Sequence, residues 1–309
     1  MLSIEQVGCY VPERRIALEQ LGERNVMSPR ELQVYKRIFG LDRIALSELS
    51  WLDMLTRAAE QALNSAQLDR DQVALVVFTH TASETAPYGH GLPGRLLRRL
   101  RLQECTVFGL HSNNCASMLN ALKISGHYLR GAPADRKALL VTGDLTFTGI
   151  MHSIPNTTIC GDGSAACLVG TGTRGMRVEA VRIDTFGRHA GGVWQTQEQM
   201  LEFENTYATR LADVIRAALA DAGCTMNEIR CVIPHNVNQV SWKAVAALLD
   251  IPMQRIYLDQ LPHLGHCYGA DILINLSLAC EEQVVRPGDR VVLATVGLGA
   301  TFAAAVVQL

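Results

Sequence analysis

The stretch FGLHSNNCASMLNALKISGHYL, residues 108–129, places a cysteine between an apolar, strand-like run and a helix-like pattern. Cys115 is therefore expected near the first helical turn, where free backbone N–H groups and the helix dipole favour a thiolate. The same N–H groups can hold an oxyanion. A small buried residue at a crowded strand-to-helix junction produces the same pattern. This stretch alone leaves both interpretations open.

A thiol nucleophile benefits from a base, and the stretch VIPHNVNQVSW, residues 232–242, offers one. His235 follows an apolar strand and Pro234 directly. This order predicts that the strand ends there and exposes the imidazole at its C-terminal edge. The alternative is a hydrogen-bonded structural histidine.

A third polar stretch is HLGHCYGADILINLSLACEE, residues 263–282, in which Asp271 heads an apolar helix beginning at Ile272. One interpretation makes Asp271 the N-cap of that helix. The other has Asp271 orient His235 and stabilise its protonated form, as the carboxylate of a catalytic triad does.

Neither a metal nor a cofactor is predicted. The spacing of His263, His266 and Cys267 matches no standard metal site, and no GxGxxG or GxxxxGK[ST] motif occurs. The nine cysteines are irregularly spaced and include no CxxC pair, which favours reduced thiols packed as small apolar residues.

Length and composition narrow the class of protein. The 309 residues can bury a substantial core, and a net charge of -2 with 19% charged residues excludes a global basic field for nucleic acid or an anionic membrane. No apolar run approaches the length of a membrane span, and the first residues lack the layout of a signal peptide. We therefore expect a cytoplasmic protein.

The chain contains two segments that align without a gap, Ala62 to His80 and Ala218 to Asn236. In each, a helical Ala/Leu pattern runs into a polar turn and then an apolar strand. Further apolar strands are expected at 137–144, 165–172, 290–297 and 301–309. These patterns predict a duplicated α/β unit in layers, with halves at 1–172 and 173–309 and a pocket at their junction.

Six motifs occur in order along nearly the whole chain: GCYVPERRI, RIFGLDRI, NNCASMLNAL, CGDGSAACLV, PHNVN and GLGATFAAAVV. Together they resemble the thiolase superfamily, and within it the ketoacyl-acyl-carrier-protein synthase III branch. The resemblance implies a five-layered αβαβα sandwich of two similar halves that works as a homodimer.

By position, Cys115 resembles the family's acyl-accepting nucleophile and His235 its catalytic histidine. The backbone N–H of Cys115, with one from the GLG turn around Leu298, matches the oxyanion hole. Condensing members have an asparagine after the Tyr/His-Gly pair, but this chain has Ala270 there and then Asp271. The stretch GHCYGADILIN is more similar to synthase-III-like acyltransferases with a Cys-His-Asp arrangement.

This departure favours acyl transfer over carbon–carbon bond formation. Condensation creates an enolate that needs hydrogen-bond donors, which an ionised carboxylate does not offer. Transfer to an oxygen or nitrogen acceptor needs a base, which an Asp271-supported histidine provides. We expect an acyl-CoA or acyl-carrier-protein donor, a small-molecule acceptor and a role in secondary metabolism. The alternatives are a condensing synthase that uses a malonyl thioester and a non-catalytic partner subunit.

Two segments are expected at the site entrance, Thr81 to Leu102 and Phe186 to Met200. The first carries a basic group, which either docks the acidic face of a carrier protein or forms a solvated helix face. Its members are Arg95, Arg98, Arg99 and Arg101.

Overall fold

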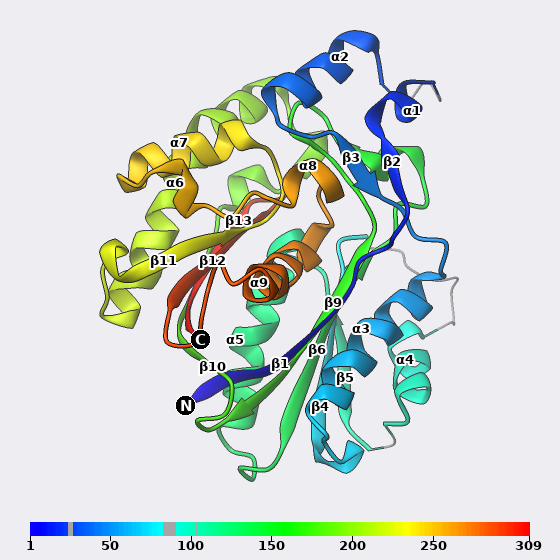
Figure 1. The fold of residues 1–309 in the computed structure, drawn as a ribbon, viewed down its shortest axis with the longest axis vertical. Helices are drawn as coiled ribbons and strands as arrows, with labels where there is room; N and C mark the ends of the chain where they lie inside the picture. Colours follow the sequence, from blue (N-terminus) through cyan, green and yellow to red (C-terminus); the bar gives the residue numbers. More distant parts are fainter. Residues whose placement is uncertain (24–26, 83–90, 103) are drawn as a thin grey trace.

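The computed structural model describes residues 1–23, 27–82, 91–102 and 104–309 (Figure 1). The strands are β1 (Leu2–Tyr10), β2 (Arg15–Ala17), β3 (Arg43–Ala45), β4 (Val73–Thr79), β5 (Thr106–Leu110), β6 (Lys137–Asp144), β7 (Ser153–Ile154), β8 (Thr158–Ile159), β9 (Gly163–Thr171), β10 (Met176–Thr185), β11 (Ile229–Pro234), β12 (Arg290–Gly297) and β13 (Thr301–Gln308). The α-helices are α1 (Leu18–Glu23), α2 (Pro29–Gln33), α3 (Trp51–Ser65), α4 (Leu92–Leu100), α5 (Ser117–Leu129), α6 (Gln197–Ala222), α7 (Gln239–Leu249), α8 (Leu261–Leu264) and α9 (Asp271–Glu281).

One nine-stranded sheet runs through the molecule in the order β11-β12-β13-β10-β1-β9-β6-β4-β5. Strands β5, β4 and β6 are parallel, as are β11 and β12, and the other pairings are antiparallel. The antiparallel pair β1 and β10 joins the two halves of the sheet.

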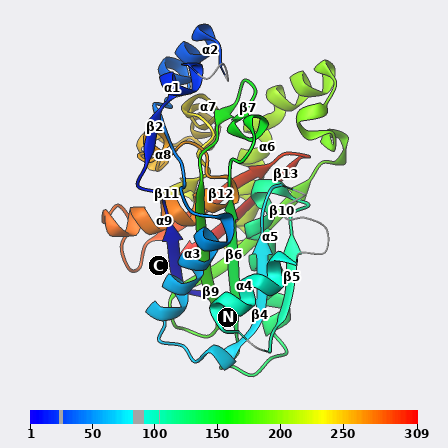
Figure 2. The same cartoon turned by 90° about the vertical axis from the view of Figure 1, so that its right-hand side faces the viewer.

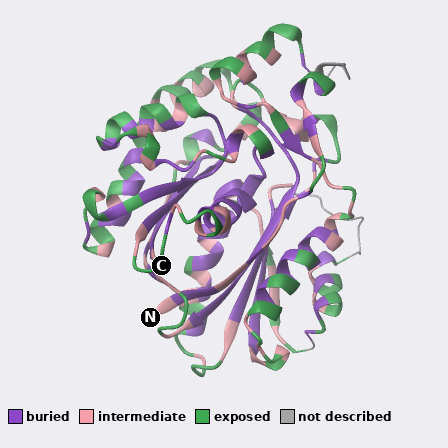
Figure 3. Cartoon of the chain, viewed as in Figure 1, coloured by how far each residue is buried: buried purple, intermediate pink, exposed green. Residues whose placement is uncertain are grey.

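Helices cover both halves of this sheet. Helices α5 and α9 lie between the two halves, α3 and α4 pack outside the β4–β6–β9 half, and α6 and α7 pack outside the β11–β12–β13 half (Figures 1 and 2). Most strands and the central helices are largely buried, whereas β5 and β10 are partly exposed and the outer helices expose one face (Figure 3). These layers confirm the expected five-layered αβαβα sandwich.

The internal duplication is visible as repeated structure. Helix α3 leads through a 3-10 turn at Arg70–Gln72 into β4, and α6 leads through one at Met226–Glu228 into β11. The inner helices repeat as well, because the 3-10 turn η3 (Asn114–Ala116) precedes α5 and η9 (Tyr268–Ala270) precedes α9. The first residue of each inner turn has a positive φ, 47° and 53°. The predicted boundary at 172/173 falls between β9 and β10, and its status as a domain boundary stays a prediction.

The longest helix, α6, is delimited by its own sequence. Thr196 and Gln199 form a capping box at its start, and Gly223 ends it with a φ of 67°.

Within the described ranges, no helix has both the length and the apolar character required to cross a membrane.

Candidate active site

Cys115 lies in the turn η3, at the end of β5 and the start of α5. The two asparagines before it bond to the other half of the chain. Asn113 Nδ2 donates to Thr301 Oγ1 at 3.1 Å, and Asn114 Nδ2 donates to the Leu298 carbonyl at 2.5 Å. The C-terminal half therefore holds the turn that carries the thiol.

The end of β12 packs directly on the same turn. A Cβ atom at Gly297 would lie 1.8 Å from the Asn113 carbonyl oxygen, so only glycine allows this approach. Thr295, also on β12, donates its hydroxyl to the Cys115 carbonyl at 3.3 Å. The turn η3, which we call the nucleophile turn because it carries the proposed nucleophile Cys115, is thus fixed against the second half of the sheet.

Three side chains form a buried chain of contacts at this point. Nε2 of His266 lies 3.3 Å from Sγ of Cys115, and Nδ1 of His266 lies 2.5 Å from Oδ2 of Asp271. Their exposed fractions are 4%, 1% and 0% in the order Cys115, His266, Asp271. This is the geometry of a thiol, a base and an orienting carboxylate.

His266 reaches Cys115 because its backbone joins a strand end of the other half. Its N–H donates to the Ile159 carbonyl at 2.9 Å, and its own carbonyl accepts from Gly161 N–H at 3.0 Å. Gly265 makes the preceding turn with a φ of 69°, and a Cβ there would lie 2.8 Å from the Ile159 oxygen.

Asp271 accepts three hydrogen bonds, from Asn236 and Cys267, besides its contact with His266. The backbone N–H groups of Asn236 and Cys267 donate to it at 2.6 and 2.7 Å, and Asn236 Nδ2 donates at 3.4 Å. Asn275 Nδ2 donates in turn to Asn236 Oδ1 at 2.8 Å. This network fixes the carboxylate toward His266.

Electrostatics favour a charged His266. Burial alone lowers the pKa of this imidazole, but the Asp271 carboxylate and the Cys115 thiolate outweigh burial and raise the pKa. The raised pKa favours the imidazolium form of His266.

His235 occupies a different position. It lies at the end of β11 but is 1% exposed, so the prediction of an exposed imidazole is wrong. Tyr207 OH lies 3.0 Å from its Nε2, and the Trp242 indole covers the ring with a centroid distance of 5.6 Å. Burial, and next the charge of His266, lower the pKa of His235 well below its usual range.

The other cysteines are unsuited to nucleophilic chemistry. All nine are free thiols. Burial raises the pKa of each of the eight thiols other than Cys115, including Cys160, which packs beside Cys115 and Tyr268. These groups stay protonated near neutral pH.

A cavity of about 280 Å³ opens next to this site. It lies between α6, α7 and the segment around β7, and both Tyr207 and Leu298 line it. Its apolar lining residues are Ile154, Pro155, Val193, Met200, Phe203, Ala208, Val240, Ala244 and Leu298. The cavity therefore borders Tyr207, which contacts His235, and Leu298, which bonds to the turn that carries Cys115, whereas Cys115, His235 and His266 are not among its lining residues.

The family model described as 3-Oxoacyl-[acyl-carrier-protein (ACP)] synthase III C terminal matches residues 219–309. A relative from a Ruegeria species, named beta-ketoacyl-[acyl-carrier-protein] synthase III, is 30% identical over 274 residues, which are 82% of this chain and 83% of the relative. The chain belongs to the beta-ketoacyl-[acyl-carrier-protein] synthase III family. Members of this family are enzymes that act on acyl thioesters.

Solved structures of the synthase III type share the fold. The structure titled ChlB3, an acyltransferase, has a TM-score of 0.88 at 21% identity and covers 100% of this chain and 97% of its own. The 3-oxoacyl-[acyl-carrier-protein] synthase III of Aquifex aeolicus has a TM-score of 0.82 at 21% identity, with 100% of both chains covered. The thiolase-like fold of this synthase III family member is thereby confirmed.

The structure brings Cys115 and Asp271 together, but through His266. The prediction that Asp271 orients His235 is wrong, because the carboxylate bonds to the His266 imidazole and to the backbone N–H of the residue after His235. The N-cap interpretation is wrong too: Asp271 is the first residue of α9, Ala270 is the N-cap, and no side chain caps the helix. The catalytic roles of Cys115, His235 and Asp271 stay predictions.

Sequence reasoning considered His266 only as a metal ligand and missed its pairing with Asp271. The two are five residues apart, with the turn η9 between them, and this spacing is the one signal that sequence offered. Asn236 and Tyr207 carried no such signal. His263 is exposed on α8, and the described residues contain no group of three or more His, Cys, Asp or Glu side chains able to hold a metal.

The predicted oxyanion residues and entrance segments can also be placed. Leu298 lies beside the nucleophile turn through its bond with Asn114, and the role of the two backbone N–H groups stays a prediction. Residues 192–200 line the cavity in part, whereas residues 83–90 of the other entrance segment lie outside the described residues.

The basic group of that segment lies on the exposed face of α4 and just beyond it, and one member, Arg99, pairs with Asp53 at 3.0 Å.

Proposed function

We propose that this protein is an acyltransferase that takes an acyl group from a coenzyme A or carrier-protein thioester onto Cys115 and passes it to an oxygen or nitrogen acceptor. The observation that carries this proposal is His266, which contacts Cys115 with one ring nitrogen and Asp271 with the other.

The first half-reaction uses the thiolate and the imidazolium. Cys115 Sγ attacks the thioester carbonyl, and the carbon–sulfur bond to the donor breaks as the tetrahedral intermediate collapses. His266 Nε2–H is placed to protonate the departing thiolate. The backbone N–H groups of Cys115 and of the turn around Leu298 are the proposed donors to the oxyanion.

In the second half-reaction the neutral His266 acts as base. It removes the proton of the acceptor as the acceptor oxygen or nitrogen attacks the acyl-cysteine carbonyl. The bond to Cys115 Sγ then breaks, and the thiolate and imidazolium are restored. Asp271 keeps the imidazole in orientation and stabilises its charged form.

Two features favour transfer over condensation. An enolate needs neutral or cationic donors, but Ala270 has no polar side-chain atom where condensing relatives carry an asparagine. His235, the other expected donor, has its Nε2 bonded to Tyr207. ChlB3, which shares the fold, is named an acyltransferase, and that name supports the same conclusion.

The test is intact-mass analysis after incubation with a panel of acyl thioesters, followed by addition of acceptors. We expect an acyl adduct on the peptide that carries Cys115 and its discharge by an alcohol or amine. Carbon dioxide released from a malonyl thioester in step with product would instead identify a condensing synthase.

A further inference from the structure

Tyr207 lies where the cavity meets the buried site. Its hydroxyl is 3.0 Å from Nε2 of His235, and its ring packs edge-on against Phe203 and Phe302 with centroid distances of 5.6 and 5.9 Å. Tyr207 also lines the cavity. We infer that Tyr207 binds and orients the acceptor, and that the acceptor is an uncharged alcohol with an apolar body. This inference rests on the proposed acyl transfer.

His235, which contacts the Tyr207 hydroxyl, is itself fixed by two hydrogen bonds of its backbone. His235 donates its backbone N–H to the Ala294 carbonyl at 3.1 Å, and Trp242 Nε1 donates to the His235 carbonyl at 3.0 Å. Burial raises the pKa of Tyr207, so the hydroxyl keeps its proton. A phenol donates one hydrogen bond and accepts up to two, so the bond to His235 leaves capacity for a partner in the cavity.

The hydrogen-bond directions suit an alcohol. With the ring proton of His235 on Nε2, the imidazole donates to the phenol oxygen and the Tyr207 proton is directed to the acceptor. An alcohol oxygen accepts that bond with one lone pair and attacks the acyl carbonyl with the other, while its proton passes to His266. An amine has one lone pair, which this bond would occupy.

The residues that line the cavity indicate that the body of the acceptor is apolar. Apolar side chains such as Met200, Phe203 and Val240 form most of the described lining, and the one charged residue within that described lining, Glu204, is exposed. An anion or an ammonium ion would lose hydration there without gaining a buried partner of opposite charge.

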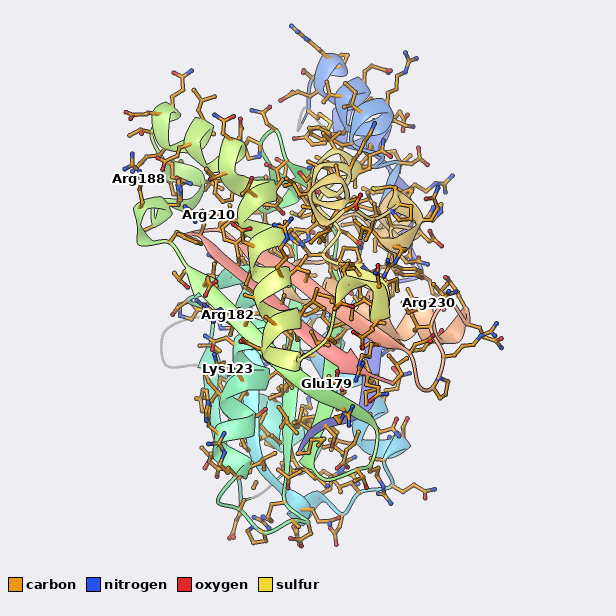
Figure 4. All side chains as sticks on the ribbon, turned by 90° about the vertical axis from the view of Figure 1, so that its left-hand side faces the viewer. Lys123, Glu179, Arg182, Arg188, Arg210 and Arg230 are labelled. Atoms are coloured by element: carbon orange, nitrogen blue, oxygen red, sulfur yellow. The ribbon has the colours of Figure 1, made fainter. Side chains whose placement is uncertain are left out.

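The basic side chains on the nearby outer face of the molecule do not alter the apolar character of the cavity. Arg182 and Arg188 pair with Asp184 and Glu202 at 3.0 and 2.6 Å, and the Arg210 guanidinium stacks over a phenylalanine ring at 4.4 Å (Figure 4). None of these arginines is among the lining residues of the cavity. Among the residues that the structure describes, the lining of the cavity thus contains no cation to recognise a carboxylate or phosphate on the acceptor.

The experiment loads Cys115 with an acyl group and then adds one of three matched probes: cyclohexylmethanol, cyclohexylmethylamine or 4-(hydroxymethyl)cyclohexanecarboxylate. We expect the alcohol to discharge the acyl-enzyme fastest. Tyr207→Phe should slow this transfer by about ten- to a hundred-fold and raise the KM for the alcohol, because the cavity loses its donor. Acylation of Cys115 should change much less.

The matched control is Tyr128→Phe, which removes a phenol hydroxyl on α5 that bonds to Thr106 of β5 and Ala74 of β4 and does not line the cavity, and which should transfer at the wild-type rate. A second variant, Ala244→Leu, narrows the apolar wall without touching Tyr207 and should raise the KM for the same alcohol. If Tyr207→Phe does not fold, Ala244→Leu still tests whether the alcohol binds in this cavity.

The outcomes separate the two proposals. Normal acylation of Tyr207→Phe with wild-type transfer to the alcohol would overturn the role of Tyr207. Faster discharge by the amine or the carboxylate-bearing probe would overturn the acceptor class. A wild type that never acylates Cys115 would overturn the proposed function itself, and this inference with it.

Discussion

Nε2 of His266 lies 3.3 Å from Sγ of Cys115, although the two residues are 151 positions apart in the chain. The contact joins the nucleophile turn of one half to a loop of the other. It places a histidine other than His235 beside the thiol, and the proposed role of His266 as base can be tested residue by residue.

The first prediction concerns the nucleophile. Cys115→Ala should abolish the acyl adduct, because burial raises the pKa of each of the other thiols and keeps them protonated. Intact-mass analysis checks this result. Cys105→Ala serves as control and should label like the wild type, whereas full labelling of Cys115→Ala would remove the thiol from the mechanism.

The second prediction separates the two histidines. His266→Ala should slow acyl transfer by about a hundred- to ten-thousand-fold, the usual effect of removing a general base. His235→Ala should have a smaller effect, because Tyr207 separates its Nε2 from the reacting atoms in our proposal. Single-turnover rates for both variants measure this, and the reverse order would return the base to His235.

The third prediction concerns Asp271. Since its carboxylate raises the pKa of His266, Asp271→Asn should shift the His266 titration to lower pH and slow transfer about a hundred-fold or more. NMR of the imidazole protons follows the titration. An unchanged His266 midpoint would contradict the proposed role of the carboxylate.

Stability gives an independent measurement on the same residue. Asp271→Ala leaves the buried N–H groups of Asn236 and Cys267 without this acceptor, at about 1–3 kcal/mol each. An N-cap would account for only about 1 kcal/mol. Denaturant unfolding of the variant distinguishes these values.

The fourth prediction is a pH dependence of stability. The unfolded imidazole of His235 takes up a proton below about pH 6.5, but the folded one does not, because its pKa is lowered. The unfolded state then binds more protons, so stability falls as pH drops from about 6.5 toward the lowered pKa. Melting temperatures of His235→Gln should show a shallower acid decline than those of the wild type.

Burial also lowers the pKa of His80, so His80 contributes to the same loss of stability in acid. Only the difference between His235→Gln and the wild type therefore reports on His235. The exposed His263 offers a control, and His263→Gln should decline like the wild type. Equal slopes for His235→Gln and the wild type would show that His235 titrates normally in the fold.

The fifth prediction is a homodimer in solution, which the family resemblance implies. Strand β5 comes last in the order of the nine-stranded sheet and is partly exposed, and an edge strand of this kind can pair with another chain. Light scattering over a range of concentrations should give the dimer mass. A monomer at all concentrations would contradict the expectation.

The sequence by itself determined the elements and their duplication. Apolar runs of strand length and helical Ala/Leu patterns depend on local periodicity, so β6 and β12 begin and end where the pattern placed them. The same local order placed Cys115 at a helix start and showed a carboxylate at Asp271.

Only the tertiary structure decided which histidine contacts the thiol. His235 follows an apolar strand and Pro234, whereas His266 stands five residues before Asp271, and neither local pattern shows which imidazole reaches the thiol. The choice depends on backbone pairing between His266 and the segment around Ile159, and on Tyr207 and Trp242 covering His235. These contacts join residues far apart in the chain, and their geometry is set by the packing of whole layers rather than by any local pattern.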